Sequence, residues 1–167
     1  MLIDEAVIFV RSGKGGDGCM SFRREKYVPK GGPDGGDGGE GGSVRIVAST
    51  SVNTLLGMAG RHHYFARDGQ PGLSDQCHGK NGEDLSVDVP VGTLVYESDN
   101  GQLLGDLDVP GKGLVIAKGG KGGFGNTHFK SSTDQTPRHF MPGEPAEETT
   151  VRLELKLVAD LGLVGKP

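Results

Sequence analysis

Three segments of the sequence interleave basic with aromatic side chains. They are SFRREKYVPK (21–30), RHHYFAR (61–67) and KGGKGGFGNTHFKSSTDQTPRHF (118–140). Lysine and arginine neutralise phosphates, and aromatic rings stack on unpaired bases, so this pattern is typical of RNA binding. The candidate RNA-binding residues, with Lys80 added from a neighbouring loop, are Arg23, Arg24, Lys26, Lys30, Arg61, Arg67, Lys80, Lys121, Lys130 and Arg138.

The aromatic side chains leave a second use open. The chain has only six Phe, three Tyr and no Trp, and a packed core needs large apolar side chains. For Phe22, Tyr64 and Phe65, packing in the core and contact with RNA are equally compatible with the sequence.

The sequence contains no catalytic constellation. Its five histidines are scattered over Gly-, Arg- or Lys-containing segments, and its two cysteines, Cys19 and Cys77, have no CxxC partner. We therefore expect no metal site and no disulfide framework, which fits a reducing cytosol. The N-terminus is acidic and its apolar run is short, so neither a signal peptide nor a membrane span of about 20 residues is expected.

The formal net charge of −4 conceals an uneven distribution. Residues 11–30 hold six Lys and Arg against two Asp and Glu, residues 61–80 hold three against two, and residues 112–139 hold five against one. The remaining chain is strongly acidic. Basic patches on an acidic body produce a local field that the net charge does not report.

Strand patterns dominate the chain. Apolar or alternating runs predict strands over 2–10, 43–48, 85–92, 113–119 and 149–165, and two more within 93–107. Asn100-Gly101 separates two of these runs and predicts a hairpin turn at positive φ. The one helical candidate is a single turn within 51–60, capped by Ser51 or Asn53. These features predict an all-β domain, a small barrel or sandwich.

The segment GGPDGGDGGEGG (31–42) has a three-residue glycine register, which recurs at Gly119, Gly122 and Gly125. Polyproline II geometry has three residues per turn, so these glycines leave one bare face for close backbone packing. We predict ordered, bundled left-handed helices here, against the alternative of disordered glycine loops. Asp34, Asp37 and Glu40 share the same register and are expected to form a solvent-facing acidic face.

Several long motifs occur in order along residues 1–158. They are IDEAVIFVRSGKGGDGCMSFRREKYVPKGGPDGGDGGEGGSV, HHYFARDGQPG, GKNGEDLSVDVPVGTLV, KGGKGGFGNTHFKSSTDQTPR and PGEPAEE. This combination resembles the N-terminal glycine-rich domain of the Obg family of GTPases. The resemblance implies a small β-barrel base carrying a bundle of six left-handed glycine-rich helices. It also implies that the three basic loops converge at one end.

The same resemblance implies a role. Such a domain is expected to bind the large (50S) ribosomal subunit and its rRNA near the peptidyl transferase centre as a tRNA mimic. The family acts in late large-subunit assembly and in the stringent response, in the cytoplasm. The domain is expected to be a monomer that is not membrane-bound. The alternative is a protein–protein interaction domain that docks regulatory partners.

The C-terminal residues resemble the start of a GTPase domain. Residues 1–158 are expected to form one domain, and 159–167 the first strand and start of the phosphate loop of a second. Gly165, Lys166 and Pro167 would be the first three positions of a G-x-x-x-x-G-K-[ST] loop. We expect the longer parent protein to use GTP and Mg²⁺, and these 167 residues alone to need no cofactor and to lack GTPase activity.

Overall fold

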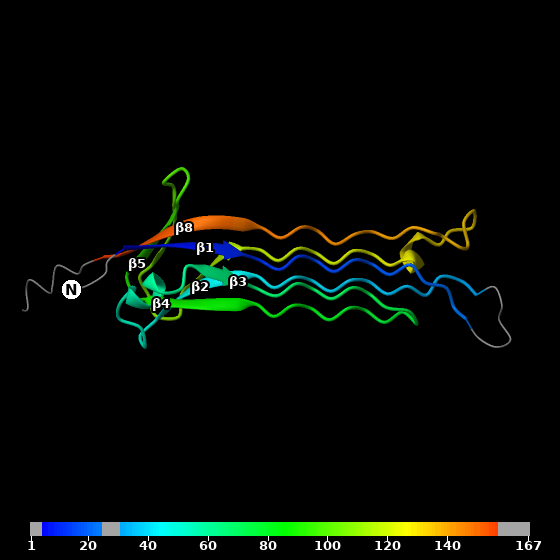
Figure 1. Ribbon diagram of the computed structural model, residues 1–167, viewed down its shortest axis with the longest axis horizontal. Helices are drawn as coiled ribbons and strands as arrows, with labels where there is room; N and C mark the ends of the chain where they lie inside the picture. The colour runs from blue at the N-terminus through cyan, green and yellow to red at the C-terminus, as the bar shows by residue number, and fades with distance from the viewer. Residues whose placement is uncertain (1–4, 25–30, 157–167) are drawn as a thin grey trace, which may run out of the picture.

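The structure is a computed structural model, and it describes residues 5–24 and 31–156. A base of short β-strands carries a long bundle of extended segments (Figure 1). The described strands are β1 (Glu5–Arg11), β2 (Val44–Ser49), β3 (His63–Phe65), β4 (Leu85–Pro90), β5 (Thr93–Glu97), β6 (Leu103–Leu107), β7 (Gly113–Ala117) and β8 (Glu148–Leu155). Two short 3₁₀ helices complete it, η1 (Leu56–Ala59) and η2 (Asn126–Phe129).

The strands of the base form two mixed sheets. One has the order β3-β1-β8-β5-β6, and the other has the order β4-β2-β7. The edge strands of the two sheets also meet, because β3 contacts β4 and β6 contacts β7. The base is therefore a small barrel-like structure, and the all-β prediction is confirmed.

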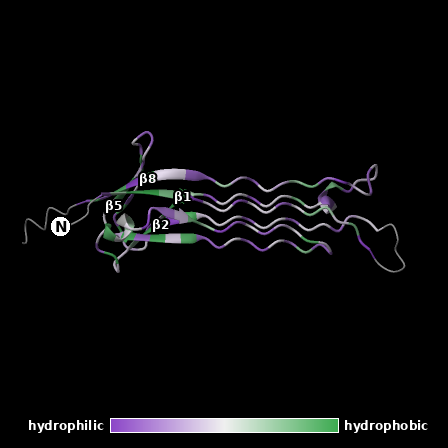
Figure 2. Ribbon diagram, viewed as in Figure 1, coloured by the Kyte–Doolittle hydropathy of each residue, from purple (hydrophilic) through white to green (hydrophobic). Residues whose placement is uncertain are grey.

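The hydrophobic core lies within the base. Alternation places Val44, Ile46 and Ala48 of β2 inside, while Arg45 is exposed. Core side chains also come from β1, β4, β5 and β8, and apolar residues concentrate at this end of the molecule (Figure 2). The small apolar fraction of the sequence is thus sufficient for one compact core at one end.

Three local expectations are corrected. The helical turn η1 begins after Leu55 with no side-chain cap, so the capping prediction for Ser51 and Asn53 was wrong. In the β5–β6 hairpin only Gly101 of the predicted turn pair has positive φ, 72°. Strand β3 was not predicted, because its three residues are too few to show a period. It forms by pairing in parallel with β1.

The bundle consists of hydrogen-bonded glycine-rich segments. Within the described residues six segments take part, 12–22, 33–43, 66–73, 77–84, 118–126 and 141–147. The amides of Gly13, Gly16 and Cys19 donate to carbonyl oxygens three residues apart on the second segment, at 2.8–2.9 Å. This spacing explains the three-residue register. The bonding also contradicts disordered loops, while the left-handed helical sense of the segments stays a prediction.

The glycines are required by close backbone approach. A Cβ placed on Gly38 would overlap the carbonyl oxygen of Gly16, and one on Gly41 would overlap that of Gly13. Because the obstructing atoms belong to the backbone, no side-chain rearrangement can relieve them. The bare faces of the segments are therefore what allows hydrogen bonds to form sideways between neighbours.

The acidic residues of 31–42 do not form the expected solvent-facing row. Asp34 is only 6 % exposed. Its Oδ2 and its carbonyl oxygen accept the amides of Asp75 and Gln76, whose φ values are 58° and 56°. Asp34 thus stabilises a tight reversal that has no glycine. Asp37 is half-buried and only Glu40 is exposed, so the prediction was wrong for two of the three residues.

Candidate nucleic-acid interface

The bundle ends far from the sheets in a cluster of turns that we call the distal end, residues 20–24, 31–35, 73–77 and 126–140 (Figure 1). Four predicted RNA-binding residues lie here, Arg23, Arg24, Lys130 and Arg138, and all are exposed. Lys130 follows η2, and its Nζ lies beside Gly32. The exposed carboxylates of the described distal end belong to Asp75 and Asp134.

The Asn126 side chain is hydrogen-bonded to three different segments of the chain beneath this surface. It is fully buried. Its Oδ1 accepts the amide of Gly35 at 2.9 Å, and its Nδ2 donates to the carbonyl oxygens of Ser21 at 2.9 Å and Pro137 at 3.2 Å. Ser21 and Pro137 precede Phe22 and Arg138, so one side chain sets the spacing of the two basic turns.

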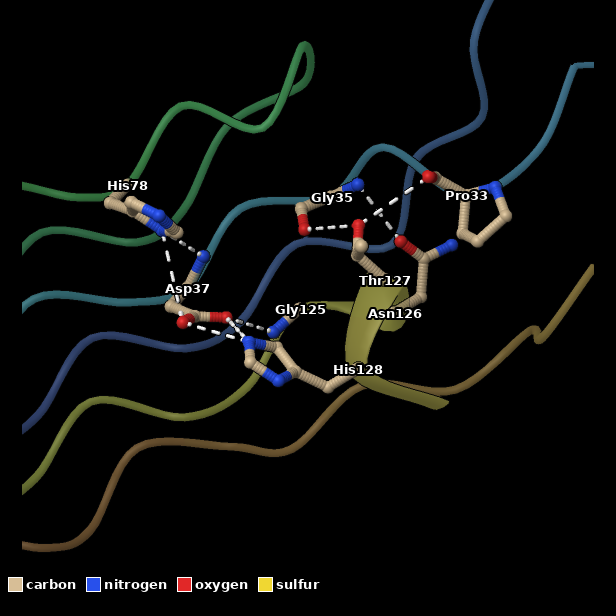
Figure 3. Close-up of polar contacts among 8 residues, drawn as sticks. All are labelled: Pro33, Gly35, Asp37, His78, Gly125, Asn126, Thr127 and His128. Atoms are coloured by element: carbon tan, nitrogen blue, oxygen red, sulfur yellow. Dashed lines mark hydrogen bonds and ion pairs between the residues drawn. The ribbon is translucent and has the colours of Figure 1, made fainter. Parts of the chain in front are cut away.

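Thr127 adds to the same anchor. Its hydroxyl donates to the carbonyl oxygen of Gly35 at 3.0 Å and also approaches that of Pro33 (Figure 3). The η2 turn is thereby attached to the segment that begins the glycine register.

Asp37 makes a second anchor, one step along the bundle. Its Oδ1 accepts the amide of Gly125 at 2.9 Å, and the Nε2 of His128 lies 2.9 and 3.0 Å from its two oxygens (Figure 3). The Nδ1 of His78 accepts the Asp37 amide at 3.0 Å. The same nitrogen lies 3.8 Å from Asp37 Oδ2, too far for a hydrogen bond.

Aromatic rings also lie at and next to the distal end, one of them beside a basic group. The Arg138 guanidinium lies 5.6 Å from the Phe22 ring centre, within the range of a cation–π contact. Phe124 and His128 stack at 4.2 Å, and Phe129 and His139 are tilted at 4.4 Å. These rings are not in the core of the base.

Tyr64 and Phe65 are adjacent in the sequence, but one is buried in the core and the other is exposed. Tyr64 is buried in the base, where its hydroxyl contacts the sulfur of Met58. Phe65 is 51 % exposed on the opposite face of β3 and packs edge-on against Phe9.

The remaining described candidates do not join the distal end. Arg61 lies at the base, where its guanidinium covers the Tyr64 ring at 4.3 Å. Arg67 begins a bundle segment at its junction with the base, and with Lys80 it lines an open pocket of about 600 Å³. Lys121 lies along the bundle. The expected convergence of three basic loops is therefore wrong for 61–67, because β3 holds that loop in the base sheet.

Five predicted residues lie outside the described part of the chain. They are Lys26 and Lys30 of the first basic segment, and Gly165, Lys166 and Pro167 of the phosphate-loop start. The predicted boundary after residue 158 also lies there. Within residues 5–24 and 31–156, no group of three or more His, Cys, Asp or Glu is arranged to hold a metal ion. No helix in this part is long and apolar enough to cross a membrane.

The thiol of Cys19 lies near the distal end, half-buried, and both cysteines are free. Burial raises the pKa of Cys19, and the negative charge of Asp34 raises it further. A thiol with a raised pKa is a poor nucleophile at neutral pH, so Cys19 is not an activated group.

The architecture can now be compared with known proteins. Residues 3–157 match the family model described as GTP1/OBG. This chain belongs to the GTP1/OBG family. A curated relative, GTPase Obg of Fervidobacterium nodosum, is 54 % identical over 165 residues, which is 99 % of this chain and 38 % of the relative. The chain thus spans well under half the length of that relative and corresponds to an Obg N-terminal domain, as the resemblance implied.

The sequence reasoning missed the anchoring roles of Asn126 and Asp37. Gly120 and Gly123 begin a second three-residue series, and Asn126 occupies its next position, where the chain is equally buried. A polar residue at a register position otherwise occupied by glycine could have indicated a buried side chain that bonds to neighbouring segments. The bonds from Asp37 to Gly125 and His128 join segments about 90 residues apart, and nothing local indicated them.

Proposed function

We propose that this chain binds the large ribosomal subunit through rRNA, with the distal end as its contact surface. The observation that carries the proposal is the placement of Arg23, Arg24, Lys130 and Arg138 at the far end of a stiff bundle. A narrow, cross-bonded rod with cations at its end is suited to entering a cavity lined by phosphates. Phosphate contacts of this kind provide affinity and orientation without sequence readout.

Family membership supports a finer proposal. We propose that the distal end reaches the peptidyl transferase centre as a tRNA mimic during late large-subunit assembly in the cytoplasm. Coupling to the stringent response, GTP and Mg²⁺ use, and hydrolysis would belong to the longer family protein. The sequence has no complete G-x-x-x-x-G-K-[ST] motif, so this chain alone should show no saturable GTP binding in a nucleotide titration.

The test is cosedimentation of the chain with purified large subunits over a salt series. A distal variant reverses the charge of Arg24, Lys130 and Arg138. A control variant reverses Lys80, Lys118 and Lys121 along the bundle, so that the net charge change is the same. Each lost phosphate contact should reduce the slope of log K against log salt by roughly 0.7–0.9.

The distal variant should therefore bind more weakly, with a salt slope reduced by roughly 2.1–2.7 units, while the control retains most of the affinity and of the slope. Equal effects of the two variants would refute a localised distal interface. Binding that is independent of salt would instead favour docking onto a ribosomal or regulatory protein.

A further inference from the structure

A pair of stacked aromatic rings lies where the distal end meets the bundle and has no role in the phosphate contacts above. The rings of Phe124 and His128 lie 4.2 Å apart with an interplanar angle of 19°. Phe124 is 45 % exposed and the His128 side chain 44 % exposed. Each ring of the stacked pair is therefore partly open to solvent.

One carboxylate contacts the His128 ring and the backbone next to Phe124. His128 Nε2 contacts both oxygens of Asp37, and the amide of Gly125, the residue after Phe124, donates to Asp37 Oδ1 (Figure 3). The η2 turn that carries His128 is fixed in addition by buried Asn126. A ligand that stacks here has few rotamers to order, which favours affinity.

Other ring pairs of the described residues are not flat in this way. Phe129 and His139 are inclined at 52°, and Phe9 and Phe65 in the base are nearly perpendicular at 89°. A near-parallel pair can be extended by a further ring stacked on an outer face, which continues the existing stack.

We propose that Phe124 and His128 form a stacking site for one unpaired RNA base. Lys130 follows His128 by two residues, and Arg138 is positioned by Asn126 through Pro137. Both belong to the distal end and can neutralise phosphates of the RNA strand that carries the stacked base. This inference rests on the proposed rRNA binding and adds a preference for unpaired bases, since bases within a duplex are already stacked on each other.

An apolar protein segment would not need these flanking cations. Stacking on an aromatic side chain tolerates any base, because every base has a π face. The site therefore predicts selection of single-stranded over duplex RNA, with little preference for sequence.

The test measures fluorescence anisotropy of labelled RNA with the complete 167-residue chain. The probes are a single-stranded decamer, an abasic decamer with the same phosphates, and a duplex. Phe124→Leu removes the π face and retains an apolar side chain. The matched control is Phe65→Leu, which alters an exposed phenylalanine of the base. His128→Gln is a second variant that keeps a hydrogen-bond donor toward Asp37.

Phe124→Leu and His128→Gln should each weaken binding of the intact decamer about five-fold or more. Their affinity for the abasic decamer, and all affinities of the Phe65→Leu variant, should not change. Equal losses on intact and abasic RNA would overturn the stacking site, and so would equal affinity of the unaltered chain for both.

The two proposals can fail separately. If the charge-reversed distal variant loses subunit binding but Phe124→Leu behaves like the unaltered chain with every RNA, only the stacking site is refuted. If the chain prefers intact to abasic RNA through Phe124 but does not bind large subunits, the stacking site stands and the ribosomal assignment fails.

Discussion

Replacement of Gly38 by alanine tests whether the bundle depends on bare backbone faces. The added Cβ would overlap the carbonyl oxygen of Gly16 well inside ordinary contact, which begins at 3.4 Å. The two segments would have to separate by more than an ångström. Two hydrogen bonds lie at this level, from Gly16 to Gly39 at 2.8 Å and from Gly38 to Gly123 at 2.9 Å.

The expected cost follows from those two bonds. Each broken bond that leaves one buried group without a partner costs about 1–3 kcal/mol, so the loss for two bonds is about 2–6 kcal/mol. Whole domains are stable by only about 5–15 kcal/mol. For a domain of this size, the melting temperature should fall by roughly 5–20 °C.

The assay is differential scanning calorimetry of matched glycine-to-alanine variants. Gly57 in η1 has no atom within 4 Å of an added Cβ, so Gly57→Ala should have little effect. Gly101 also has open space but has a φ of 72°, so Gly101→Ala should cost about 1–2 kcal/mol through backbone strain alone. A melting temperature of Gly38→Ala equal to that of Gly57→Ala would refute the packing argument.

Three further predictions concern the bundle and its distal end. Amides over residues 36–42 should exchange with solvent far more slowly than in a free peptide of the same sequence, as measured by NMR. The reason is that each of these amides donates a hydrogen bond to another segment. Asn126→Ala should lower the free energy of unfolding by about 2–6 kcal/mol, because the Gly35 amide and the Pro137 carbonyl oxygen lose their recorded partner. An unchanged urea midpoint would contradict this anchor. In a Cys77→Ser background, alkylation of Cys19 should be slow at neutral pH and should accelerate only as the pH rises toward its raised pKa. Asp34→Asn removes the smaller of the two causes and should shift that profile to lower pH, so a shift upward would contradict the assigned cause.

The elements of the base were predictable because each strand carries its own alternation. Val44, Ile46 and Ala48 point inward as period two requires, and the observed strand has nearly the predicted limits. The exception is β3, whose three residues depend on a partner strand for their conformation. Family membership was equally available, since long ordered motifs carry it.

The site was only partly predictable. Basic residue types in loops indicated nucleic acid, but of the ten candidates only Arg23, Arg24, Lys130 and Arg138 are brought together within the described residues. The adjacent Tyr64 and Phe65 lie in the core and on the surface because successive side chains of a strand point to opposite faces of the sheet. Which face is inward depends on the sheet and not on the residue.

The sequence by itself determined that the glycine segments are ordered and not disordered. A glycine at every third position removes the Cβ from one face, and this local property is sufficient for close packing. Only the tertiary structure decided which segments become neighbours and what the acidic residues do. Asp34 accepts the amide of Asp75 in a distant turn, and Asp37 accepts the amide of Gly125. Extended segments do not bond their own N–H groups, so these groups need acceptors on neighbouring segments.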